Sequence, residues 1–153
     1  IRLHLWDIAG QDRLGGISKL FCRDAAGALV VTDIKDPKTL ENAVTWKEQV
    51  DSHLESDGEN IPMVLAVNKY DLVEQQELDG KQIDETMTQS YLDDFATGNG
   101  FVGAFRTSAK SSSNVTNAFS ILVREILKQK ACKSFQLFRH IQSTVKCKYT
   151  ENK

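Results

Sequence analysis

The chain has few of the residues that mark fibrous, disordered or disulfide-stabilised proteins. Only 2 prolines and 9 glycines occur in 153 residues, which excludes collagen, proline-rich linkers and low-complexity disorder. The 3 cysteines have no C-x-x-C spacing, which argues against a disulfide framework and a zinc knuckle and indicates the reducing cytosol. The longest apolar run, residues 25–31, is too short to span a bilayer. The length is that of a single domain.

Charge is unevenly distributed along the chain, although the formal net charge is only −2. Residues 124–153 carry a net charge of +6, and the remaining residues carry −8. An acidic body with a basic tail argues against general nucleic-acid binding. Such a tail favours an anionic surface instead.

Two kinds of hydrophobic pattern alternate along the chain. Polar and apolar residues alternate over residues 1–6, which predicts a half-buried strand. Continuous apolar runs predict fully buried strands over residues 26–31, 63–67 and 101–106. Apolar residues at helical spacing predict three helices. The first starts at Asp36-Pro37 and stops at Asp57-Gly58, the second spans residues 83–95, and the third starts at Asn114. This alternation predicts an α/β fold with a doubly wound, mostly parallel sheet and helices on both faces.

Polar clusters follow three of the predicted strands, over residues 7–11, 68–71 and 107–110. Ligands of doubly wound sheets bind outside the carboxyl ends of the strands. The three clusters therefore predict one composite site.

The first cluster is Asp7-Ile8-Ala9-Gly10-Gln11. An acidic residue at a strand end can hold Mg²⁺ through water, and a glycine lets a backbone N–H approach a phosphate. A glutamine can orient an attacking water. On its own, this D-x-x-G pattern is equally compatible with a simple turn.

The second and third clusters carry the chemistry of a base pocket. In Asn68-Lys69-Tyr70-Asp71, the aspartate carboxylate can accept N1–H and N2–H₂ of guanine together, and the lysine stem can pack on the base. Asn68 can tie the neighbouring loops together. In Thr107-Ser108-Ala109-Lys110, the backbone N–H of Ala109 can donate to guanine O6. Each cluster alone fits a surface turn, but the three in order favour a site.

In these motifs and their order, residues 1–130 resemble a small GTPase of the Ras superfamily, nearest to its Rab branch. Trp6-Asp7-x-Ala9-Gly10-Gln11 is similar to the Rab form of the D-x-x-G box. The sequence also resembles the Rab subgroup that serves lysosome-related organelles at three places: Ile8, Asp33-Ile34 and Trp46-Lys47. The resemblance implies a G domain of the P-loop NTPase type that binds GTP or GDP with Mg²⁺. It also implies slow GTP hydrolysis that regulates intracellular vesicle traffic on the cytosolic face of endomembranes.

The resemblance also implies a role for each matching residue. Asp7 would contact Mg²⁺ through water, Gly10 would sense the γ-phosphate, and Gln11 would position the hydrolytic water. The guanine pocket would consist of Asn68, Lys69, Asp71, Ser108, Ala109 and Lys110. Trp6 and Phe21 would meet effector and regulator proteins beside and within the second switch segment, although Phe21 also fits a core position.

The sequence departs from the family pattern in its phosphate-binding parts. It contains no G-x-x-x-x-G-K-[S/T] loop, and Gly80-Lys81 lacks the remaining residues of that motif. The first switch is also absent, so we expect both parts, with the first two strands and the first helix, to lie before Ile1. Residues 1–6 would then lack both neighbouring strands, and the chain alone would be inactive. A nucleotide-free interaction module and a non-functional fragment stay open as alternatives.

Residues 131–153 form a basic tail that we expect to be a helix extension or a loosely ordered segment. Cys147 lies within it, in a context that matches neither C-a-a-X nor a terminal cysteine pair, so no prenylation motif is seen. The apolar and basic residues of the tail also fit a helix that lies on an anionic membrane.

Overall fold

The computed structural model describes residues 2–8, 22, 24–55 and 60–148. Three strands and five helical segments follow one another in these residues. Their order is β1 (Ala28–Asp33), α2 (Lys38–Glu55), β2 (Met63–Asn68), α3 (Asp71–Leu78), the 3₁₀ helix η1 (Glu85–Met87), α4 (Gln89–Gly98), β3 (Ala104–Arg106) and α5 (Val115–Lys148).

The three strands form one parallel sheet in the order β1-β2-β3. Leu65 in the central strand pairs with Val30 on one side and with Ala104 on the other. Helices connect each strand to the next, as parallel pairing requires. The predicted doubly wound α/β fold is confirmed.

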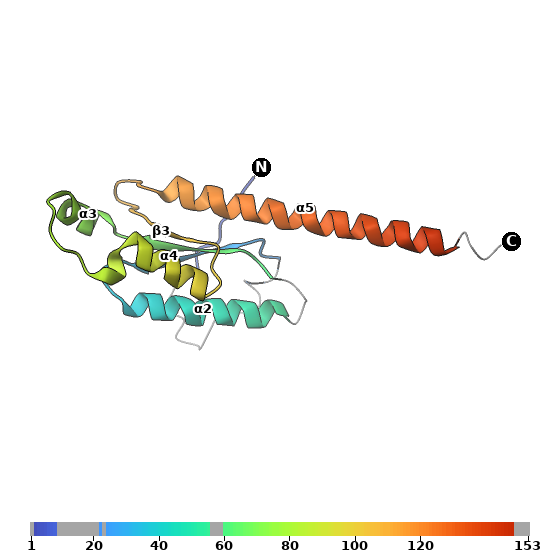
Figure 1. Cartoon of the computed structure of the whole chain (residues 1–153), viewed down its shortest axis with the longest axis horizontal. Coiled ribbons are helices and arrows are strands. Elements are labelled where there is room, and N and C mark those ends of the chain that lie inside the picture. Colours follow the sequence, from blue (N-terminus) through green and yellow to red (C-terminus); the bar gives the residue numbers. More distant parts are fainter. Residues whose placement is uncertain (1, 9–21, 23, 56–59, 149–153) are drawn as a thin grey trace.

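The sheet is covered on both faces, and the pleat of β2 decides which side chain meets which helix (Figure 1). Met63, Leu65 and Val67 point into the larger core, which also holds apolar residues of α2 and α4. Val64 points the other way and packs against Ala118 and Leu122 of α5.

The chain passes close to α5 just before β1. A Cβ atom at Gly27 would lie 2.8 Å from Cδ1 of Ile126, so any larger residue here would force the Ile126 side chain to shift. Glycine at this position therefore lets α5 lie close to the chain where it enters the sheet.

Helix α2 begins as the sequence predicts. The Asp36 side chain accepts a hydrogen bond from the Lys38 N–H at 3.1 Å, and Pro37 occupies the first turn, where it needs no N–H partner. Four of the helix's apolar residues are buried at helical spacing: Leu40, Ala43, Val50 and Leu54. The helix ends at Glu55, and the predicted stop at Asp57-Gly58 lies outside the described residues.

The strand predicted over residues 1–6 is wrong. Residues 2–8 are neither helix nor strand, and Leu3, Leu5 and Trp6 expose 49%, 72% and 79% of their surface. A strand needs a neighbour for its N–H and C=O groups, and no described residue pairs with this segment.

The helices after β2 also differ from the prediction. Helix α3 was not predicted, and the helix expected over residues 83–95 begins only at Gln89, where Thr88 caps it. Before it, Asp84 caps η1 by accepting the Thr86 N–H. Two capping residues in sequence therefore divide the predicted helix into two pieces.

Helix α5 runs without interruption from Val115 to Lys148. It therefore continues past residue 130, where the sequence predicts the basic tail to begin. Its sequence contains no glycine or proline, the two residues that most often end a helix.

Candidate functional site

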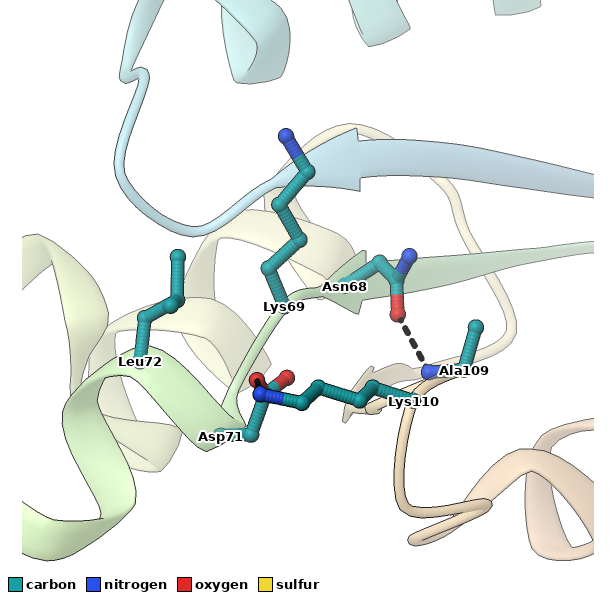
Figure 2. Close-up of a pocket in the computed structure, with 6 residues that line it drawn as sticks. All are labelled: Asn68, Lys69, Asp71, Leu72, Ala109 and Lys110. Atoms are coloured by element: carbon teal, nitrogen blue, oxygen red, sulfur yellow. Dashed lines mark hydrogen bonds and ion pairs between the residues drawn. The ribbon is translucent and has the colours of Figure 1, made fainter.

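A pocket with a cavity volume of about 330 Å³ lies where the carboxyl ends of the strands meet. Its size is at the lower end of the range for small-molecule sites. Figure 2 shows the six residues that line it, and five of them belong to the second and third predicted clusters. They are Asn68, Lys69, Asp71, Leu72, Ala109 and Lys110.

Asn68 ends β2 and links the two loops that form the pocket. Its side-chain Oδ1 accepts a hydrogen bond at 3.0 Å from the backbone N–H of Ala109, 41 residues further along the chain. The sequence predicts that this N–H donates to guanine O6. A base would therefore share it with Asn68 in a three-centre hydrogen bond.

Lys69 has a left-handed backbone with φ of +65°, which turns the chain sharply between β2 and α3. Its side chain extends toward β1, away from Asp71 and Lys110 (Figure 2). Its Nζ lies 2.6 Å from Oδ2 of Asp33. The hydrogen bond from Lys69, followed by that from the Lys35 N–H, lowers the pKa of Asp33, and the same bond raises the pKa of Lys69.

Asp71 is the first residue of α3, where the partial positive charge of the helix N-terminus favours a carboxylate. Its Oδ1 accepts a hydrogen bond from the Ser108 hydroxyl at 2.6 Å. Its Oδ2 lies 3.9 Å from Nζ of Lys110. Each carboxylate oxygen has two lone pairs, so Asp71 keeps acceptor capacity for a ligand.

Ser108 is completely buried and does not line the pocket. Its hydroxyl also accepts from the Ser111 N–H at 3.2 Å, and its own N–H donates to the Ser113 carbonyl at 3.0 Å. These contacts make Ser108 a support for Asp71, while Ala109 and Lys110 are exposed at the surface.

The first predicted cluster is not part of the pocket as the structure describes it. Trp6 and Asp7 are exposed and do not line it. Gly10, Gln11 and Phe21 lie outside the described residues. Within residues 2–8, 22, 24–55 and 60–148, no three His, Cys, Asp or Glu side chains are grouped to hold a metal ion. The role of Asp7 as a water-mediated Mg²⁺ contact stays a prediction.

Two residues at or near the pocket belong to none of the three predicted clusters. Asp33, the partner of Lys69, ends β1 directly opposite Asn68 in the parallel register. Leu72 follows Asp71 in α3 and adds an apolar wall that is 48% exposed. The register of β1 against β2 is the signal for Asp33, because both strands end at the same edge.

The arrangement combines a carboxylate, an exposed ammonium group and an apolar side chain around one opening. Such a set suits a flat, polar ring whose edge offers hydrogen-bond donors to Asp71 and whose face contacts aliphatic carbon.

Among the described residues, no helical segment combines the length and the apolar character that crossing a membrane requires.

Comparison with known proteins agrees with the motifs. A family model, that of the Ras family, matches residues 1–128. Ras-related protein Rab-32 of Homo sapiens is 40% identical over 129 residues, which cover 83% of this chain and 53% of that protein. Ras-related protein Rab-32A of Dictyostelium discoideum is 38% identical over 130 residues, covering 84% and 56%.

Ras-related protein Rab-7L1 of Homo sapiens is 33% identical over 129 residues, covering 84% of this chain and 59% of that protein. The chain therefore spans about half the length of the curated relatives it matches. All three relatives are Rab proteins, which confirms the predicted Rab branch. The subgroup for lysosome-related organelles stays a prediction.

Proposed function

The chain belongs to the Ras family, and on that premise we propose that it is the guanine-binding part of a Rab-type GTP switch. The longer protein would bind GTP and GDP, hydrolyse GTP slowly and regulate vesicle traffic. Its relatives in the Rab branch support this proposal.

One observation carries the proposal: the Asp71 carboxylate stands at the pocket with its orientation set by the buried Ser108 hydroxyl. Asp71 lines the opening and keeps acceptor capacity on its carboxylate oxygens, and guanine presents two adjacent donors, N1–H and N2–H₂. Adenine presents no such pair. Asp71 therefore distinguishes the two bases by hydrogen bonding.

The other pocket residues act around this contact. The Lys69 stem packs beside the base while its ammonium group stays with Asp33. Asn68 fixes the loop that carries Ala109 and Lys110. In the complete switch, Asp7 would hold Mg²⁺ through water, and the ion would neutralise phosphate charge.

The remaining roles come from the family resemblance alone. Gly10 would sense the γ-phosphate and Gln11 would orient the hydrolytic water. Trp6 and Phe21 would contact effector and regulator proteins. Trp6 is 79% exposed, as a contact residue must be. The protein would act on the cytosolic face of endomembranes, with its basic tail toward the anionic surface.

The replacement Asp71→Asn tests the proposal in the full chain. It puts an NH₂ group opposite guanine N2–H₂, and an unpaired buried donor costs about 1–3 kcal/mol. Xanthine has a carbonyl at that position and accepts the new donor. We therefore expect the preference for GDP over XDP to fall by about tenfold or more, measured by NMR titration of the ¹⁵N-labelled chain.

The matched control is Asp79→Asn, which changes a carboxylate at the opposite end of α3. It should leave the ratio of GDP to XDP affinity unchanged. Equal ratios in the wild-type and Asp71→Asn chains would contradict the assignment of Asp71 as the guanine reader.

A further inference from the structure

Three polar side chains that do not line the pocket contact one another: Tyr70, which lies within the second predicted motif, and Glu77 and Arg106, which belong to none. The Tyr70 hydroxyl donates to Oε2 of Glu77 at 2.5 Å. Arg106 donates to the other oxygen of that carboxylate, Oε1, at 2.6 Å. The guanidinium carbon of Arg106 also lies 4.5 Å from the centroid of the Tyr70 ring, within the range of a cation–π contact. Each member therefore contacts both of the others.

The cluster connects the two loops that read the base. Tyr70 lies between Lys69 and Asp71, and Arg106 ends β3 immediately before the loop of Ser108 and Ala109. The backbone strengthens the same link, because the Tyr70 N–H donates to the Thr107 carbonyl at 2.9 Å. None of the three side chains lines the pocket.

The electrostatics of the cluster favour one charge state around neutral pH. The Tyr70 hydroxyl and the Arg106 guanidinium lower the pKa of Glu77, while the bond to Glu77 raises the pKa of Tyr70. Glu77 therefore stays ionised and Tyr70 stays protonated, which are the states that the two hydrogen bonds need.

We propose that Tyr70, Glu77 and Arg106 form a clamp that positions the loops after β2 and β3 for guanine recognition. The proposal rests on the proposed function. The three are positioning residues, because they act through Asp71 and Ala109 without touching the base. A site held by such a supporting network keeps its donors and acceptors in place before the ligand arrives.

A second ion pair in the chain offers a matched control. Lys47 and Asp51 are 2.5 Å apart, and their side chains are 16% and 28% exposed. The corresponding values for Arg106 and Glu77 are 2.6 Å, 18% and 29%. The control pair lies within α2, away from the pocket. Asp51→Asn therefore removes a comparable charge without touching the two loops.

The experiment compares Glu77→Gln with Asp51→Asn in the full ¹⁵N-labelled chain, with GDP and ADP as probes. We expect Glu77→Gln to weaken GDP binding about fivefold and to leave ADP binding unchanged. Asp51→Asn should change neither affinity. Arg106→Lys keeps the charge opposite Glu77 and should recover part of the GDP affinity relative to Arg106→Ala.

Amide hydrogen exchange gives a readout that needs no ligand. In Glu77→Gln, we expect the amides of Tyr70 and Ala109 to exchange faster relative to the Leu65 amide of β2, which donates to the Gly103 carbonyl just before β3. A purely structural loss would speed exchange at all three amides together.

The outcomes separate the clamp from the proposed function. Absence of GDP-induced shifts at the pocket of the wild-type chain would count against guanine binding, and the exchange data would still judge the clamp. Equal losses of GDP and ADP affinity, or unchanged relative exchange at Tyr70 and Ala109, would overturn the clamp.

Discussion

Residues 2–8 and the loop after β2 both carry a predicted motif, but the side chains of only the second motif are held by another part of the structure. Trp6 and Asp7 are exposed in a segment that pairs with no described strand. Asn68 and Asp71 are each held by a hydrogen bond from the loop after β3. The comparison shows that a sequence motif has a defined geometry only where other elements fix its side chains. Mutations can measure how much these contacts contribute to the free energy of unfolding.

The largest difference in the free energy of unfolding should appear between alanine substitutions at two leucines. Leu65 is fully buried in β2, while Leu5 is 72% exposed. Leu65→Ala leaves a cavity in the core and should lower the free energy of unfolding by about 2–5 kcal/mol. Leu5→Ala should change it by no more than about 0.5 kcal/mol. Urea unfolding of both variants checks this, and equal losses would contradict the description of residues 2–8 as unsupported.

A smaller effect should follow from Ser108→Ala. The change removes the buried hydroxyl that donates to Asp71 and accepts from the Ser111 N–H. The free energy of unfolding should fall by about 1–2 kcal/mol. Ser52→Ala is the control, because its exposed hydroxyl donates only to a carbonyl within α2. Equal urea midpoints for the two variants would show that Ser108 does not support the pocket.

The smallest effect concerns the ion pair of Asp33 and Lys69. The folded state lowers the pKa of Asp33 from its ordinary value of 3.8, so its contribution to stability is present above 3.8. That contribution is lost as the pH falls through the lowered pKa. Asp33→Asn should therefore destabilise the chain at pH 7 and progressively less below pH 3.8.

Urea unfolding of the wild-type chain and Asp33→Asn across this pH range measures the difference. Asp94→Asn, an exposed position on α4, is the control. If the difference in unfolding free energy between the wild-type chain and Asp33→Asn stays constant as the pH falls, the effect does not come from the charge of Asp33.

Elements with strong local signals could be predicted from the sequence. The continuous apolar run of β2 and the Asp36-Pro37 start of α2 were both confirmed. Helix α3 was missed because only one of its eight residues, Val73, is buried, so it has almost no hydrophobic period. The strand over residues 1–6 was predicted from a correct alternation, but strand formation depends on a partner that local sequence does not encode.

In the pocket, too, some features could be predicted from the sequence and others could not. The convergence of residues 68–71 and 107–110 follows from strand order and parallel direction, both of which the sequence indicates. The contacts of Lys69 with Asp33 and of Glu77 with Arg106 join distant parts of the chain, 36 and 29 residues apart. Such pairings depend on register and side-chain direction, which a single sequence does not reveal.

The length of α5 sets a distance for anything that binds its far end. A continuous helix of 34 residues is about 51 Å long, and its first turns pack against the sheet through Ala118 and Leu122. Figure 1 shows the remainder extending beyond the other elements. A flexible tether would let the pocket sample every orientation relative to anything bound at the far end of α5, whereas a continuous helix sets both the distance and the direction between them.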